Sequence, residues 1–134
     1  MVEDTYTLAT TVHRPYRETL SATKDALTEQ GFGILTEIDM ADTLKAKLGV
    51  DIAQQVILGA CRPSLAYEAL LAEPSIAAVL PCNVVVRDAG ESTTLVEAFD
   101  PQAMMRLADT PALRDVATDA RSRLTAALAA LKEY

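Results

Sequence analysis

The feature that most constrains the fold is a regular succession of strand-like and helix-like segments separated by glycine or proline. Residues 5–12 are rich in Thr and Val and partly alternate, which predicts a strand. Residues 13–31 predict a helix. A proline stands where its first turn would be, a glycine stands where it would end, and the residues at helical spacing between them form one buried stripe. The chain then turns through residues 31–33 into a second predicted strand, 34–40. This order predicts one strand-helix-strand unit.

A short helix is predicted over residues 41–49, with Asp39 as its cap and Gly49 as its stop. Leu44 and Leu48 are expected to face the core. Asp39 also forms an i, i+2 pair with Glu37 on one strand face, and paired acids can divide acid and base roles. The cap is the simpler interpretation of Asp39.

The third strand, 54–61, is apolar in its middle and is therefore expected to be central. A third helix opens at Pro63 and ends before Pro74, because a proline disfavours helical geometry in the residue before it. Residues 77–99 predict a hairpin, since two β-rich runs are joined by Asp, Gly and Ser over 88–92.

The rest of the chain predicts helix, broken near Thr110–Pro111, with the last helix over about 111–132. One face of this helix stays apolar over about five turns. The helix is expected either to cover the sheet or to pair with a second copy. The apolar positions are Leu113, Val116, Ala120, Leu124, Leu128 and Leu131.

Together these segments give the order β-α-β-α-β-α-β-β-α-α. The order predicts an α+β fold, in which a single layered domain over residues 1–134 has one mixed sheet packed with helices. A chain of 134 residues is long enough to bury a core without disulfides or metals.

Composition excludes several classes of function. The net charge is −7 and the basic residues are scattered, so a nucleic acid partner is not expected. The densest basic group, Arg121–Arg123, fits the solvated face of a helix. No apolar run is long enough for a membrane helix and no signal peptide is evident, so we expect a cytoplasmic protein that does not enter a membrane. The common nucleotide-binding and hydrolase motifs are missing.

The main candidates for a reactive site are the two cysteines, Cys61 and Cys82, each of which lies beside a proline. Cys61 is expected at a strand end just before a helix that starts at Pro63. The positive end of that helix, with help from Arg62, is expected to stabilise a thiolate and lower the pKa of Cys61. Cys82 begins the next strand, and the two sulfurs meet if the strands are neighbours.

Three interpretations of the cysteines stay open. They are inert core thiols, a redox or nucleophilic pair, or a soft-metal site that His13 completes by converging on the same edge. Because their spacing matches no known ligand pattern, the sequence assigns no metal site and identifies no cofactor.

The segments "GFGILTEIDM", "GACRP..LAYEALLAEPSIAAV" and "LPCNVVV" resemble the DUF302 family of uncharacterised domains. The resemblance runs from about residue 6 to about residue 105. It implies an α+β fold and a dimer, in bacteria or archaea, and no activity. Arg62 stands where the family often has Asn.

The sequence therefore predicts a homodimeric binding or accessory module for a small ligand or a partner protein. A thiol-dependent redox enzyme or sulfur carrier that uses Cys61 with Cys82 is the alternative, and a soft-metal protein is third, so enzymatic activity stays undecided. The binding candidates are Arg62, Pro63, Asn83 and His13.

Overall fold

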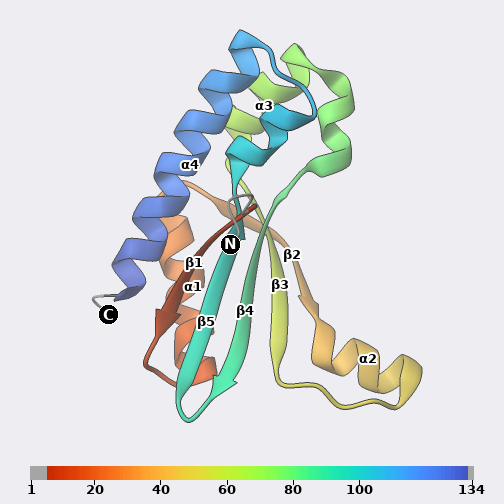
Figure 1. Cartoon of the computed structure of the whole chain (residues 1–134), viewed down its shortest axis with the longest axis vertical. Coiled ribbons are helices and arrows are strands. Elements are labelled where there is room, and N and C mark those ends of the chain that lie inside the picture. Colours follow the sequence, from red (N-terminus) through yellow and green to blue (C-terminus); the bar gives the residue numbers. More distant parts are fainter. Residues whose placement is uncertain (1–5, 133–134) are drawn as a thin grey trace.

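The computed structural model describes residues 6–132, which form five strands, four α-helices and two short 3-10 helices (Figure 1). The strands are β1 (Thr7–Val12), β2 (Gly33–Asp39), β3 (Gln55–Cys61), β4 (Cys82–Gly90) and β5 (Thr93–Phe99). The α-helices are α1 (Tyr16–Glu29), α2 (Met40–Leu48), α3 (Pro63–Ala72) and α4 (Pro111–Lys132), and the 3-10 helices are η1 (Pro74–Val79) and η2 (Pro101–Arg106). Thr5, where the first strand was expected to begin, lies outside the described residues.

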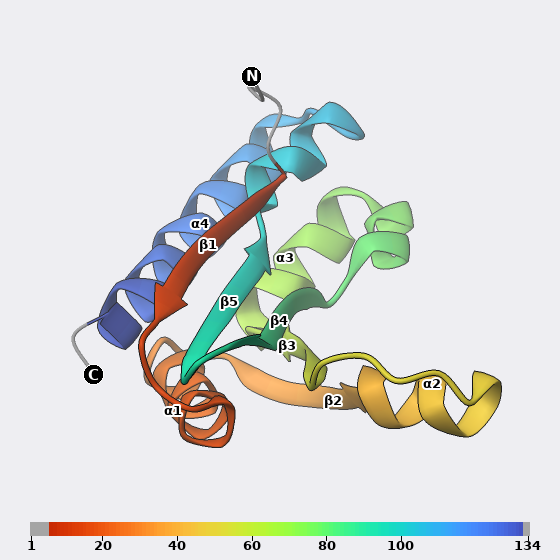
Figure 2. The same ribbon diagram turned by 60° about the horizontal axis from the view of Figure 1, so that its bottom comes forward.

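The five strands form one sheet in the order β1-β5-β4-β3-β2. This confirms the α+β class with a single sheet. Every pairing in the sheet is antiparallel, so the expectation of a mixed sheet was wrong. The connections account for this. α2 joins the neighbouring strands β2 and β3, and α3 with η1 joins the neighbouring strands β3 and β4. α1 links the two edge strands, β1 and β2 (Figure 2).

Helices α1 and α4 cover one face of the sheet. Alternate residues of the central strands point into this layer, including Leu58 of β3 and Val84 of β4, and meet Leu27 of α1 and Leu124 of α4. All six apolar positions predicted for the last helix are buried, which confirms the stripe along α4. We call β1, β5, β4 and β3, together with α1 and α4, the body.

A second apolar cluster closes one end of the sheet. It joins Leu65 of α3 and Ile76 of η1 to Met104 of η2 and to Leu113 and Val116 in the first turns of α4. The tail after β5 was expected to be helical throughout, but its first part, η2, has 3-10 geometry. The predicted break before α4 is confirmed, and the Thr110 hydroxyl accepts a hydrogen bond from the Leu113 amide at 3.2 Å.

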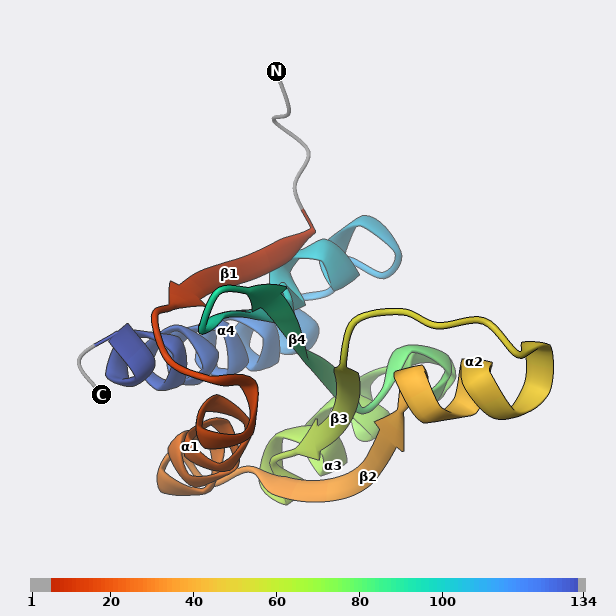
Figure 3. The ribbon, with the colours of Figure 1, turned by 90° about the horizontal axis from the view of Figure 1, so that it is seen from below.

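Residues 33–54, here called the arm, begin with β2, which pairs along β3 at the edge of the sheet. The arm contains β2, α2 and the connection to β3, and Figure 3 shows α2 projecting on the side of the sheet opposite α1 and α4. No residue of α2 is buried. Leu48 is 69% exposed, so the expectation that it faces the core was wrong, because α2 contacts mainly the ends of β2 and β3.

The ends of α2 follow the sequence prediction. The Asp39 carboxylate accepts a hydrogen bond from the Asp42 amide at 2.9 Å, which confirms the cap, and Gly49 ends the helix in the left-handed conformation. None of the helices over residues 6–132 combines the length and the apolar composition that a membrane span requires.

Candidate functional site

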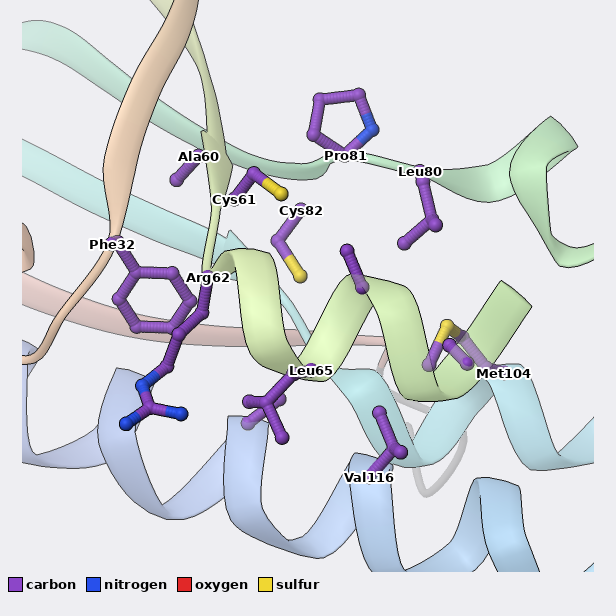
Figure 4. Close-up of a pocket in the computed structure, with 13 residues that line it drawn as sticks. Phe32, Ala60, Cys61, Arg62, Leu65, Leu80, Pro81, Cys82, Met104 and Val116 are labelled. Carbon is purple, nitrogen blue, oxygen red and sulfur yellow. The ribbon is translucent and has the colours of Figure 1, made fainter. Parts of the chain in front are cut away.

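The two cysteines meet at the end of the sheet that α3 covers. β3 and β4 are antiparallel neighbours, so Cys61 at the end of β3 lies beside the start of β4, where Cys82 stands. The condition under which the sequence allowed the two cysteines to meet, that their strands are neighbours, is therefore fulfilled. Both line a cavity of about 30 Å³ between the sheet, α3, η2 and α4 (Figure 4).

The cavity is lined almost entirely by apolar atoms. Its walls include Phe32 before β2, Leu65 of α3, Leu80 and Pro81 before β4, and Val116 of α4. Three sulfur-bearing side chains from three different elements also line it: Cys61, Cys82 and Met104. Small-molecule sites usually enclose roughly 300–1,000 Å³, so this cavity is too small to enclose a metabolite.

The two thiols lie on different faces of the sheet. Cys82 pairs with Ala60, and directly paired residues share a face, so Cys82 belongs with the buried Ala60. Cys61 follows Ala60, and successive side chains on a strand alternate between faces. In Figure 4 the Cys82 sulfur points towards α3, whereas the Cys61 sulfur lies on the side of Pro81. Both cysteines are free thiols.

The electrostatics disfavour a thiolate at either position. Burial raises the pKa of Cys82 to about 11, and the neighbouring Cys61 adds to this rise. Burial also raises the pKa of Cys61. The prediction that Cys61 has a lowered pKa was therefore wrong in direction.

The start of α3 explains why the expected stabilisation is missing. Pro63 has no N–H, and the amides of Leu65 and Ala66 both donate to the Arg62 carbonyl at 3.0 Å. In the first turn this leaves few free N–H groups to stabilise an anion.

Arg62 was expected to tune the thiol, but its side chain turns away from both cysteines (Figure 4). Its Nη1 donates to the Ser64 hydroxyl at 3.0 Å, and its Nε is buried with no hydrogen-bond partner among the described residues. The guanidinium packs against Gly31, which has a φ of 87°, and a Cβ there would lie 2.9 Å from the Arg62 Nε. Gly31 is therefore required by its backbone conformation and by the approach of Arg62.

The other binding candidates are dispersed. Pro63 is exposed and forms the first residue of α3, as the sequence predicted for a helix start. Asn83 is exposed and pairs with Gly59, so it lies on the sheet face opposite Cys82.

His13 lies at the opposite end of the sheet. It follows Val12, which pairs with Thr94 near the β4–β5 turn, whereas Cys82 is at the start of β4. The expectation that His13 converges on the cysteine edge was wrong, because β1 runs away from that edge. Within the described residues no group of three His, Cys, Asp or Glu side chains is placed to hold a metal.

Sequence reasoning missed Met104 as a member of the site. It lies 22 positions after Cys82 in the chain and is only 3% exposed. The signal "DPQAMMR" shows two methionines at the start of a helical tail, but nothing local indicates which of them meets the cysteines. Only the return of the chain after β5 brings η2 to this end of the sheet.

Comparison with known proteins gives a family and a fold. The crystal structure of an uncharacterized conserved protein DUF302 from Bacillus stearothermophilus has a TM-score of 0.85 with this structure at 28% sequence identity, covering 94% of this chain and 98% of that one. No curated protein matches the chain. The family model described as "Domain of unknown function DUF302" matches residues 8–131, so the match continues through α4. The chain therefore belongs to the DUF302 family.

Proposed function

We propose that this protein is a partner-binding module that works as a homodimer, with a second copy seated on the arm. The observation that carries the proposal is α2, a helix of nine residues of which none is buried by its own chain. Isolated helices shorter than about 12–15 residues are marginal in water, and packing of an apolar face normally stabilises them. A partner that covers α2 would supply this packing.

The arm also exposes large apolar side chains, which a partner would cover. These are Leu35 and Ile38 of β2, Leu48 at the end of α2, and Val50 and Ile52 in the connection to β3.

The adjoining open face of the sheet continues this apolar surface. Ile38 pairs with Ile57, and Ile57 pairs with Val85, so these three side chains form one row across β2, β3 and β4. Within the described chain, α1 and α4 cover the other face of these strands. An antiparallel sheet can leave one face in water, but that face is then usually polar.

The far half of the same face is polar. Arg87 forms a 3.0 Å ion pair with Glu97, and the Thr7 hydroxyl donates to Glu97 at 2.8 Å. The open face is thus divided into a polar half over β4, β5 and β1 and an apolar half beside the arm. This division supports an interface that is confined to the arm side.

Symmetry supports a second copy as the occupant. In a two-fold interface each copy covers the other with the same surface, so both arms are buried together.

The experiment is sedimentation equilibrium on the wild-type chain and on Leu48→Glu/Ile52→Glu. We expect the wild type at 28.8 kDa, twice the 14.4 kDa of one chain, and the double variant at 14.4 kDa. Leu107→Glu is the matched control, because Leu107 at the end of η2 is also 69% exposed but lies outside the arm. A monomeric wild type, or a control that dissociates as fully as the double variant, would refute the proposal.

The other functions predicted from the sequence receive less support. A cavity of about 30 Å³ does not enclose a metabolite, and the raised pKa values of Cys61 and Cys82 do not favour a thiolate nucleophile. A thiol-dependent activity would be supported by rapid modification of Cys61 at neutral pH and by complete loss of turnover in Cys61→Ser.

A further inference from the structure

We propose that the free edge of β1 binds an extended peptide segment of a partner protein, which adds one strand to the sheet and sets a carboxylate side chain beside Lys132. β1 and β2 are the two opposite edges of the sheet, and the arm belongs to the β2 edge. The peptide site is therefore separate from the interface of the proposed dimer and does not depend on it.

The backbone of β1 leaves one row of hydrogen-bonding groups unpaired. The Asp100 amide donates to the Tyr6 carbonyl at 2.8 Å, so Tyr6 begins the series of hydrogen-bonded pairs between β1 and β5. Such pairs alternate with non-hydrogen-bonded pairs in an antiparallel ladder. Thr7, Ala9 and Thr11 therefore direct their N–H and C=O groups away from β5. No strand within residues 6–132 pairs with this outer side.

The two edge strands of the sheet differ in how they are protected against pairing. Charged residues, prolines and bulges are the usual protections of an edge. β2 contains Glu37 and Asp39, and its register with β3 shifts between Ile34 and Thr36. β1 has neither a charged residue nor a proline, and its register with β5 is continuous. A regular, unprotected edge is a template for another strand, so β1 is the edge at which we expect a peptide to add.

A groove of about 300 Å³ lies beside this edge, between β1 and α4. β1 and α4 run alongside each other in Figures 2 and 3. Leu8 and Ala9 line the groove from β1, and Leu128 and Ala129 line it from α4. Alternate side chains of an added strand would point towards α4, because side chains on a strand alternate between faces. The groove gives these side chains an apolar surface to pack on, in addition to the backbone hydrogen bonds.

The charges in the groove select a carboxylate on the peptide. Arg121 and Lys132 line the groove, and no Asp or Glu of the described residues does. The Arg121 Nε already pairs with the Asp100 carboxylate at 3.2 Å, whereas Lys132 has no ion-pair partner within residues 6–132. Exposed charges farther away than about 8 Å are largely screened at physiological ionic strength, so the adjacent ammonium outweighs the net charge of the chain.

Thr10 lies at the floor of the same groove and provides a further polar group. It is 6% exposed, and its Oγ1 has no hydrogen-bond partner among the described residues. Buried hydroxyls are normally hydrogen-bonded. Turning this hydroxyl towards the groove breaks no hydrogen bond, so a polar side chain of the peptide would supply the partner that it lacks.

A second copy of this chain fits the β1 edge less well than a peptide of another protein. Paired through its own β1, the second copy would bring its own Arg121 and Lys132 to the groove. It would supply no carboxylate from that lining, and the basic side chains of the two copies would repel each other. The groove therefore favours an acidic segment of a different protein.

The experiment selects strand-length peptides from a displayed random library on the immobilised wild-type chain, with Ala9→Pro as the counter-selection. Proline suits position 9 because the Ala9 N–H faces outward, so the ladder with β5 keeps its hydrogen bonds. We expect the recovered peptides to contain β-favouring residues and at least one Asp or Glu. Fluorescence anisotropy on a synthesised peptide should show an affinity at least roughly 10-fold lower for Ala9→Pro, which loses a donor and blocks the edge with its ring.

Matched variants separate the edge and its charge from general effects. Ala9→Val keeps the N–H and should bind the peptide within about 3-fold of wild type. Lys132→Glu should lower the affinity of the acidic peptide roughly 3- to 10-fold. Lys47→Glu makes the same change in net charge on the exposed surface of α2, outside the groove, and should change the affinity less than about 2-fold.

Hydrogen exchange on the wild-type chain tests the site without any variant, and thermal unfolding reports whether Ala9→Pro is folded. Added peptide should slow exchange of the outward-facing Ala9 and Thr11 amides. The proposal is overturned if the wild type recovers no peptide that Ala9→Pro loses, if the affinity of Ala9→Pro is unchanged, or if exchange at Ala9 and Thr11 does not slow.

Sedimentation equilibrium separates this proposal from that of the dimer. Leu48→Glu/Ile52→Glu should bind the peptide with wild-type affinity whatever its mass, because the arm lies at the opposite edge. Ala9→Pro should keep the mass of the wild type. A mass lowered to that of one chain by Ala9→Pro would assign the β1 edge to a second copy and overturn the peptide site.

Discussion

The body and the arm contain similar apolar residues, but these are buried in the body and exposed in the arm. Leu58 of β3 is 0% exposed under α1 and α4, whereas Leu48 of α2 is 69% exposed. Both leucines occur in regular elements with suitable caps or turns, so local sequence does not separate them. What separates them is the layer above: the body has two helices across its sheet, and the described chain places none over α2. The exposed Leu48 belongs to the surface that the proposed dimer would cover.

The largest expected effect tests this contrast directly. Leu58→Ala should lower the free energy of unfolding by about 2–5 kcal/mol, because it removes buried methyl groups and leaves a cavity. Leu48→Ala, measured by urea denaturation at concentrations where the chain is monomeric, should stay within about 0.5 kcal/mol of wild type. An equal cost for both changes would show that α2 packs on its own chain.

The reactivity of the Cys82 thiol reports how well solvent and reagents are excluded from this end of the body. A pKa of about 11 instead of 9.0 lowers the thiolate fraction of Cys82 at neutral pH by roughly 100-fold, and its alkylation rate should rise tenfold per pH unit until about pH 11. The measurement is iodoacetamide labelling of each cysteine followed by peptide mass analysis. Leu48→Glu should leave the Cys82 rate unchanged, and rapid labelling of native Cys82 at pH 7 would contradict the closed body.

The N-caps of one helix in the arm and one in the body allow a matched comparison, with a smaller expected effect on stability. Asp39 caps α2 in the arm and Thr110 caps α4 in the body, each through a bond to the amide three residues later. Replacement of either by Ala should cost about 1 kcal/mol. Hydrogen exchange should show faster exchange confined to α2 in Asp39→Ala, but faster exchange throughout the most protected body amides in Thr110→Ala. Global destabilisation by Asp39→Ala would show that arm and body unfold as one unit.

An effect of similar size to that of the caps, but of opposite sign, is expected at the β4–β5 turn of the body. Glu91 and Ser92 have φ values of 54° and 55°, a left-handed geometry that costs free energy for residues with a Cβ. Glu91→Asn with Ser92→Gly supplies the residues that such two-residue turns prefer, and should raise the free energy of unfolding by about 1 kcal/mol. The urea midpoint measures this change, and the dissociation constant of the proposed dimer should stay the same. A lower midpoint would contradict the turn geometry.

Much of the fold could be predicted because it depends on short-range physics. Proline at the start of α3 and of α4, Asp39 and Gly49 around α2, and the buried stripe of α4 all follow from backbone geometry and the helical repeat. The hairpin followed from its turn residues in the same way. The sequence by itself therefore determined the order, type and most boundaries of the elements.

The site depended on tertiary structure. Antiparallel pairing set Cys82 opposite Ala60 and put the two sulfurs on different faces, and the return of the chain through η2 added Met104. The same pairing placed His13 at the far end and let burial raise the thiol pKa values. Local propensity reaches only a few residues along the chain, whereas strand order, the covered face and desolvation arise from contacts between distant segments. That is why the sequence determined the elements of this protein and only the fold decided which of them form its core, its cavity and its exposed arm.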